Sequence, residues 1–180
     1  YKETDRHNPS NPYSASKSAS EMICLSFQNT YKIPLITVNL MNAFGQRQHP
    51  EKFIPKCIQY ILEEKELEIH TDTNNMPGSR FYIHARNASD AMLFILKKGI
   101  VGEVYNIPGQ KEVDNLTMAQ SIAEIMGKQL KYKLISDVAS RPGHDLRYCL
   151  DGKKLEQLGW APPVNFSEAL KTTILWTLEH

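Results

Sequence analysis

Short apolar runs alternate along this chain with stretches whose apolar residues recur at helical spacing. The clearest run covers residues 35–40, Leu-Ile-Thr-Val-Asn-Leu, and is β-branched and almost continuously apolar. Such a run is typical of a strand in a parallel sheet whose two faces are both covered. Because strand-like and helix-like segments alternate to the end of the chain, the sequence predicts an α/β fold rather than an all-α or all-β one.

The periodicity also places the expected elements. Strands are expected over residues 35–40, 67–70, 81–84 and 104–107, and helices over 14–31, 53–62, 88–98, 116–126, 151–158 and 166–177. A turn-rich loop is expected over residues 71–79. One face of the first helix is small to apolar and is expected to pack inward; it consists of Ala19, Met22, Ile23, Ser26, Phe27 and Thr30.

Composition narrows the possible partners. The 180 residues are 41% hydrophobic, which suffices for one substantial core, with or without a smaller lobe. Basic and acidic residues number 21 and 20 and are well mixed, so the net charge of +1 predicts neither a nucleic-acid nor a membrane-surface partner. No apolar run approaches the roughly 20 residues that span a bilayer. Cys24, Cys57 and Cys149 lack the paired spacing of metal sites and disulfide frameworks, which indicates thiols in a reducing cytoplasm.

Tyr13 and Lys17 form the first candidate catalytic pair. They lie four residues apart in an expected helix, so their side chains project from the same face. An ammonium group close to a phenol lowers the phenol's pKa from its ordinary value near ~10, so that the phenolate can act as a general base. The alternative is a solvated contact between two surface residues. The small Ser and Ala residues around the pair, and the strand that follows, favour the catalytic interpretation.

The segment around this pair resembles a known active site. Residues 11–21, Asn-Pro-Tyr-Ser-Ala-Ser-Lys-Ser-Ala-Ser-Glu, are similar to the active-site helix of the extended short-chain dehydrogenases/reductases, and within them to the dTDP-glucose 4,6-dehydratases. Further segments match this family in order and spacing: residues 42–45, 50–55, 102–107, 141–145 and 158–160. The resemblance therefore covers almost the whole chain.

The resemblance implies a fold and a division of the chain. The fold would be the C-terminal part of an NAD(P)-binding, Rossmann-type doubly wound domain, with a small α/β substrate-binding lobe. Residues 1–48 and 81–108 would belong to the Rossmann-type domain, and residues 49–80 and 109–180 to the lobe. The Gly-rich turn that cradles the NAD pyrophosphate does not occur in these residues. The chain also begins without methionine inside a polar segment, so we expect residues upstream and poor NAD binding by this part alone.

The same resemblance implies roles for individual residues. Tyr13 would remove the proton from the sugar 4-hydroxyl, and Lys17 would bind the nicotinamide ribose, with NAD preferred to NADP. A nucleotide-diphosphate sugar would be held by the remaining matched residues, which are Asn42, Lys52, His70, Arg80, Asn115, Arg141 and His144. Amide and guanidinium groups suit phosphate oxygens. The alternatives are a loop-capping role for Asn42, a surface ion pair for Arg80 and a plain surface turn for residues 141–144.

Two positions depart from the family pattern. His70 occupies the place of a tyrosine that stacks on the nucleobase, and Glu68 replaces a proline, so the identity of the base is open. Asn87 stands where an aspartate caps the following helix in many relatives, and it is expected to take over that cap.

Three functional hypotheses remain. The first is an NAD-dependent nucleotide-sugar 4,6-dehydratase, a lyase of polysaccharide biosynthesis that acts as a cytoplasmic homodimer. The second is a nucleotide-sugar 4-epimerase of the same family. The third is a nucleotide-sugar-binding fragment without catalysis. The family's Ser/Thr partner of the tyrosine and its dehydrating acid pair lie upstream of the Tyr-Lys helix, so these residues alone do not decide between dehydratase and epimerase.

Overall fold

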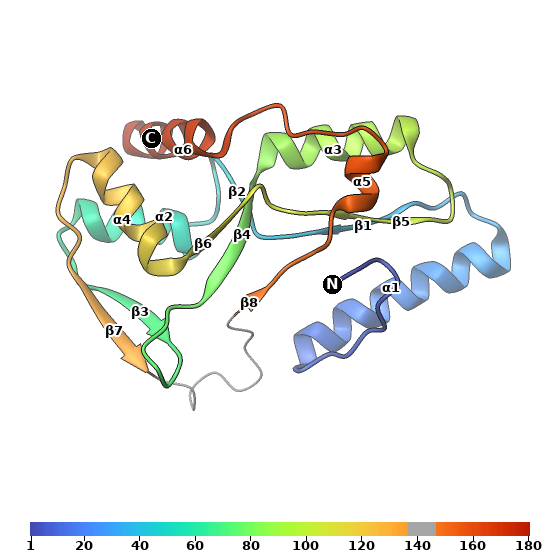
Figure 1. The fold of residues 1–180 in the computed structure, drawn as a ribbon, viewed down its shortest axis with the longest axis horizontal. Coiled ribbons are helices and arrows are strands. Elements are labelled where there is room, and N and C mark those ends of the chain that lie inside the picture. The colour runs from blue at the N-terminus through green and yellow to red at the C-terminus, as the bar shows by residue number, and fades with distance from the viewer. Residues whose placement is uncertain (137–146) are drawn as a thin grey trace.

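The computed structural model describes residues 1–136 and 147–180. Helices and strands alternate along the chain (Figure 1). The helices are α1 (Pro12–Tyr31), α2 (Phe53–Leu62), α3 (Ala85–Lys98), α4 (Asn115–Met126), α5 (Lys153–Gln157) and α6 (Phe166–Glu179). The strands are β1 (Thr37–Leu40), β2 (Ala43–Phe44), β3 (Leu67–Thr71), β4 (Ser79–His84), β5 (Val104–Ile107), β6 (Lys111–Asp114), β7 (Tyr132–Ser136) and β8 (Arg147–Tyr148).

The strands of the described residues form three small sheets that are mostly parallel. Strand β1 pairs in parallel with β5, and β3 pairs in parallel with β7. In the largest sheet β4 is central: it pairs in parallel with β2 and β8, and antiparallel with β6. The α/β class predicted from the sequence is confirmed. Strands β2, β6, β7 and β8 were not predicted, because they are short or polar and depend on pairing with distant partners.

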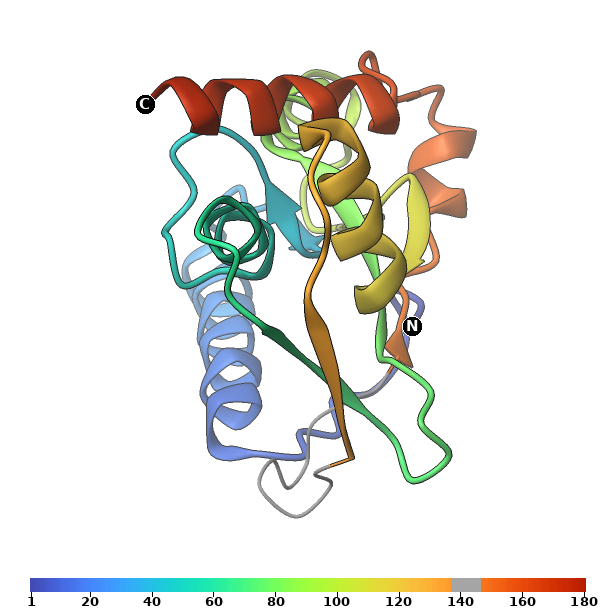
Figure 2. The same cartoon turned by 90° about the vertical axis from the view of Figure 1, so that its left-hand side faces the viewer.

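Strand β4 separates two hydrophobic cores. Its neighbouring residues Tyr82 and Ile83 point to opposite faces and enter different cores. The larger core packs α2, α4 and α6 around residues of β2, β3 and β6. The smaller core packs α3 and α5 against β5, and it includes Trp160, whose indole N–H donates to the Asp90 carboxylate at 2.8 Å. The single strand β4 thus ties both parts of the molecule together (Figures 1 and 2).

The expected inward face of the first helix is wrong for this structure. No residue of α1 is buried, and Met22, Ile23 and Phe27 are all exposed. The more covered line of the helix is polar and includes Ser14, Ser18, Glu21 and Gln28. It faces the N-terminal segment, where His7 pairs with Glu21 at 3.5 Å. The apolar side fails to pack because no described element covers it.

The expected cap of the third helix is also wrong. The N-cap of α3 is His84, whose Nδ1 accepts the backbone N–H of Arg86 at 3.3 Å. Asn87 is fully buried inside the helix and bonds to the segment that precedes α6. Its Nδ2 donates to the Val164 carbonyl at 2.8 Å, and its Oδ1 accepts the Val164 N–H at 3.0 Å. Asn87 is therefore a tertiary connector between α3 and the chain before α6.

Because of His84, the folded protein is expected to lose stability as the pH becomes acidic. Burial, helped by the nearby Arg86, lowers the pKa of His84. The unfolded chain then binds a proton more readily than the folded chain, so stability falls as the pH drops through the unfolded value near ~6.5. Asparagine is also a good N-cap. We therefore expect the free energy of unfolding to fall less for His84→Asn than for the natural protein when the pH is lowered from about 7.5 to about 5.5.

Urea unfolding at the two pH values checks this expectation. Replacing the exposed His49 with asparagine is the matched control and should leave the pH dependence as it is in the natural protein. Equal losses for His84→Asn and the natural protein would show that His84 does not contribute.

No helix in residues 1–136 and 147–180 is long and apolar enough to cross a membrane. No group of three or more His, Cys, Asp or Glu side chains in the same residues is arranged to hold a metal ion. The three cysteines are free, and burial raises the pKa of the Cys57 thiol to about 12, so this thiol is unreactive near neutral pH.

Candidate functional site

Tyr13 and Lys17 lie in the first turns of α1. The side chain of Asn11 caps the helix by accepting the N–H of Ser14 at 2.9 Å, and Pro12 occupies its first position. Both features favour helix initiation directly before Tyr13. Tyr13 is 73% exposed, and Lys17 is exposed as well. The helical spacing therefore places a phenol and an ammonium group on one open face of α1, as the sequence predicts.

A second group of polar side chains gathers where β4 meets β8. We call it the β4–β8 cluster; its members are Asn42, Ser79, Arg80, Glu112, Arg147 and Tyr148. Strand β8 lies parallel to the start of β4, with Ser79 opposite Arg147 and Arg80 opposite Tyr148. Both views place β8, the loop after β3 and the start of α1 on the lower side of the molecule, away from α6 (Figures 1 and 2).

Asn42 is held at both ends of its amide. It follows β1, and its carbonyl accepts the N–H of Ile83 at 3.2 Å. Its Nδ2 donates to the Phe81 carbonyl at 3.2 Å, and its Oδ1 accepts the Tyr148 hydroxyl at 2.6 Å. An amide nitrogen carries two hydrogens, so one N–H of Asn42 has no acceptor among the described residues and can serve a ligand.

An ion pair between Arg147 and Glu112 fixes strand β8. The Nε and Nη2 atoms of Arg147 donate to the two carboxylate oxygens of Glu112 at 2.6 and 3.0 Å, and Ser79 donates to the same carboxylate at 2.6 Å. The bonds from Arg147 and Ser79 lower the pKa of Glu112. Bidentate pairing of this kind is geometrically specific. It holds β8 against β4 and β6.

Asn115 adjoins this cluster. It begins α4, and its backbone N–H donates to the Gly78 carbonyl at 3.0 Å, directly before Ser79. Its side-chain oxygen accepts the hydroxyl of Tyr82 at 3.3 Å. Burial raises the pKa of Tyr82 above its ordinary value, so this phenol remains a neutral donor. The structure therefore brings three of the predicted substrate ligands, Asn42, Arg80 and Asn115, into one region.

No hydrogen bond, ion pair or ring contact among the described residues joins the other predicted ligands to this region. Lys52 is the exposed N-cap residue of α2 and makes no side-chain cap. His70 lies on β3, and its buried Nδ1 has no hydrogen-bond partner within residues 1–136 and 147–180. Tyr13 and Lys17 likewise have no hydrogen bond, ion pair or ring contact with the β4–β8 cluster among the described residues. Arg141 and His144 lie outside the described residues.

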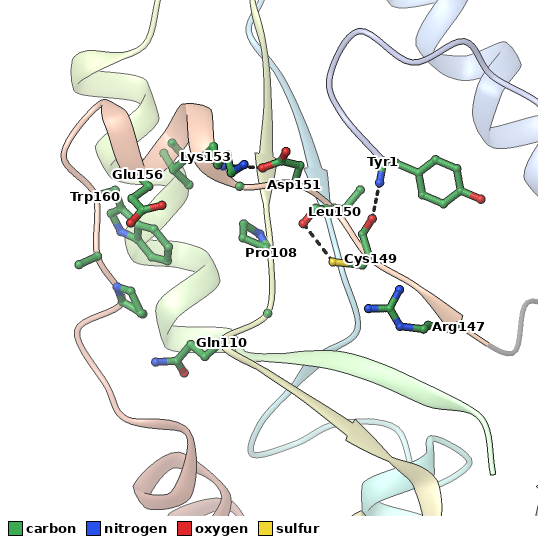
Figure 3. Close-up of a pocket in the computed structure, with 15 residues that line it drawn as sticks. Tyr1, Pro108, Gln110, Arg147, Cys149, Leu150, Asp151, Lys153, Glu156 and Trp160 are labelled. Carbon is green, nitrogen blue, oxygen red and sulfur yellow. Dashed lines mark hydrogen bonds between the residues drawn. The ribbon is translucent and has the colours of Figure 1, made fainter. Parts of the chain in front are cut away.

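A pocket of about 610 Å³ adjoins the cluster (Figure 3). It lies between the turn after β5, the segment after β8 and α5, with Arg147 and Trp160 among its lining residues. Apart from Arg147, no member of the cluster and none of the described sequence-predicted ligands lines it. Among the described residues, the pocket therefore shares only Arg147 with the β4–β8 cluster.

Sequence reasoning missed Glu112, Arg147 and Tyr148. Glu112 and Arg147 lie 35 residues apart, and no local pattern connects them. Tyr148 stands three residues after the matched segment 141–145, so extending that segment toward the C-terminus could have drawn attention to it.

A model of one enzyme family matches almost the whole chain. The family is described as GDP-mannose 4,6 dehydratase, and the match covers residues 1–173. The chain belongs to the GDP-mannose 4,6-dehydratase family. This membership confirms the epimerase/dehydratase resemblance seen in the sequence.

Curated relatives of this dehydratase-family chain cover nearly all of it. It is 35% identical over 190 residues to a dTDP-glucose 4,6-dehydratase from Neisseria gonorrhoeae, covering 100% of the chain and 54% of that protein. It is 38% identical over 172 residues to a trifunctional UDP-glucose 4,6-dehydratase, 3,5-epimerase and reductase from Arabidopsis thaliana, covering 96% of the chain and 25% of that protein. The chain thus spans a quarter to about half of the length of these relatives.

Solved structures agree with the family. The dTDP-glucose 4,6-dehydratase from Bacillus anthracis, in complex with NAD, matches with a TM-score of 0.88 at 32% identity, over 100% of this chain and 56% of its own. The Streptomyces venezuelae enzyme with NAD bound matches with a TM-score of 0.89 at 31% identity, over 100% of this chain and 55% of its own. The Rossmann-type α/β fold expected for the dehydratase family is confirmed.

Proposed function

We propose that the natural protein is an NAD-dependent nucleotide-sugar 4,6-dehydratase. The match of the whole chain to dTDP-glucose 4,6-dehydratases, at TM-scores of 0.88 and 0.89, carries this proposal. The proposed setting is cytoplasmic polysaccharide biosynthesis, with the enzyme acting as a homodimer. Residues 1–48 and 81–108 are proposed to belong to the cofactor domain, and residues 49–80 and 109–180 to the substrate lobe.

Tyr13 and Lys17 supply the proton chemistry in this proposal. The Tyr13 phenolate takes the proton of the sugar 4-hydroxyl, and the Lys17 ammonium stabilises the negative charge of the phenolate. Both side chains are open to a ligand in the structure. A general base at this position also returns the proton when the ketone is reduced in the epimerase alternative, so the pair by itself does not choose between the two reactions.

The donor set on α1 also fits part of the cofactor. An ammonium and a phenol on one open face can hydrogen-bond the hydroxyls of a ribose, so Lys17 would hold the nicotinamide ribose beside Tyr13. NAD bound there would supply the hydride-transfer chemistry of the proposed reaction, and Tyr13 would manage the proton of the sugar 4-hydroxyl. These 180 residues contain no Gly-rich turn for the pyrophosphate.

Asn42, Arg80 and Asn115 are the proposed ligands for the nucleoside diphosphate. Asn42 offers an N–H, and Arg80 offers a planar guanidinium group that suits phosphate oxygens. Arg141 and His144 are proposed to contribute from outside the described residues, and Lys52 and His70 to lie near the nucleobase. His70 supports this role through a buried ring nitrogen without a partner among residues 1–136 and 147–180.

A product analysis tests the reaction class. The natural protein is incubated with NAD and, separately, with dTDP-glucose, UDP-glucose and GDP-mannose, and the products are examined by mass spectrometry and NMR. The dehydratase proposal expects the loss of one water from at least one of these sugars. A product of unchanged mass with inverted C4 would establish the 4-epimerase instead. Tight binding with no product from any sugar would support a non-catalytic binding protein.

A further inference from the structure

Tyr148 contacts two of the proposed ligands of the nucleoside diphosphate, Asn42 and Arg80. Its hydroxyl donates to Asn42 Oδ1 at 2.6 Å, and the Arg80 guanidinium lies over its ring at 4.9 Å from the centroid. Arg80 and Tyr148 are also direct neighbours in the register of β4 and β8. One side chain from a two-residue strand thus joins two ligands that come from different parts of the chain.

The hydroxyl of Tyr148 determines which way the Asn42 amide points. In the observed orientation, Oδ1 accepts from Tyr148 and Nδ2 donates to the Phe81 carbonyl at 3.2 Å. A flipped amide would set its oxygen against the Phe81 carbonyl, which is also an acceptor. The two bonds together hold the second N–H of Asn42 in one direction. Without the hydroxyl, the longer bond to Phe81 is the one that the amide keeps among the described residues.

The ring of Tyr148 acts on Arg80 in a different way. A guanidinium over an aromatic face is attracted by the ring's quadrupole, which limits the rotamers that the long side chain samples. Arg80 also donates to the Ser79 carbonyl at 2.7 Å. The ring therefore helps to hold the guanidinium at the start of β4 before any ligand arrives, and pre-ordering of this kind lowers the cost of binding.

From these contacts we propose that Tyr148 is a positioning residue for the diphosphate of the substrate. It acts through Asn42 by its hydroxyl and through Arg80 by its ring. This inference rests on the proposed function, because it assumes that Asn42 and Arg80 bind phosphate.

The structure provides a variant that should retain its fold. Strand β8 is anchored independently of Tyr148 by the bidentate contact between Arg147 and Glu112, at 2.6 and 3.0 Å. Tyr148→Phe should therefore leave β8 in place and remove only the bond to Asn42. Tyr148→Leu removes the ring as well. Tyr60→Phe is the matched control, because it deletes the same atom from α2, outside the cluster.

Calorimetric titration of the natural protein with dTDP, UDP and GDP tests the inference. We expect Tyr148→Phe to weaken the binding of whichever diphosphate the natural protein prefers by about tenfold, Tyr148→Leu to weaken it further, and Tyr60→Phe to leave it unchanged. In steady-state assays Tyr148→Phe should raise KM more than it lowers kcat. Combined with Asn42→Ala, Tyr148→Phe should add little, because both changes disable the same N–H.

The outcomes separate the two proposals. If the natural protein binds none of the three diphosphates, the proposed function fails and the inference fails with it. If it binds one of them and Tyr148→Phe binds equally well, only the role of Tyr148 is overturned. Effects of Tyr148→Phe and Asn42→Ala that add fully would also overturn it, because Tyr148 would then not act through Asn42.

Discussion

Tyr13→Phe is expected to lower the turnover of the natural protein by about a thousandfold. The substitution removes the phenolic oxygen that accepts the substrate proton, and a positioned acid-base group contributes roughly 10²- to 10⁴-fold to a rate. The loss should appear in kcat, because the ring and its place on α1 remain. Rapid mixing of enzyme, NAD and sugar nucleotide, followed by the absorbance of the reduced cofactor, measures the step directly.

Tyr31→Phe is the matched control for this prediction. Tyr31 is an exposed tyrosine at the end of the same helix, so it reports any general effect of removing a phenol from α1. We expect it to retain the turnover of the natural protein. Turnover of Tyr13→Phe within about twofold of the natural protein would contradict the role of Tyr13 as the base.

Asn87→Ala is expected to destabilise the folded protein by about 2–4 kcal/mol. Alanine favours the helix, so the loss comes from tertiary contacts. The change leaves the Val164 N–H without its acceptor at 3.0 Å and the Gln110 side-chain oxygen without its donor at 3.1 Å. Both groups then stay buried or partly buried without these bonds, which costs more than the bonds contribute when formed.

Urea unfolding followed by circular dichroism measures the effect of Asn87→Ala. Asn8→Ala, at an exposed position in the N-terminal segment, is the control and should change the free energy of unfolding by less than about 0.5 kcal/mol. A loss of similar size in both variants would show that the bonds to Val164 and Gln110 contribute little.

The helices were the part of the fold that the sequence predicted best. The apolar residues of α2 recur at helical spacing, and Ile54, Cys57, Ile58 and Ile61 are buried as that pattern indicates. The pattern of α1 was equally clear, yet its apolar residues are exposed. Periodicity reports that a helix has an apolar side; it does not report whether anything covers that side.

In the candidate site, too, one part follows from local spacing and the other part depends on tertiary contacts. Tyr13 and Lys17 lie four residues apart, so helical geometry alone places them on one face. Asn42 and Arg80 were matched to a family motif by position, but the side chain that contacts both is Tyr148, which is 106 residues away from Asn42 in the chain. Hydrogen bonds over such separations depend on the pairing of β8 with β4, and no local pattern encodes that pairing.

The sequence by itself determined the α/β class, the helical spacing of segments such as α2, and the paired phenol and ammonium of α1. These features depend on residues within one or two helical turns of each other, where spacing decides the contact. Only the tertiary structure decided that Asn87 joins α3 to Val164 and that Tyr148 joins Asn42 to Arg80. Each of those contacts needs two distant segments to pack together, and their register is set by the whole fold.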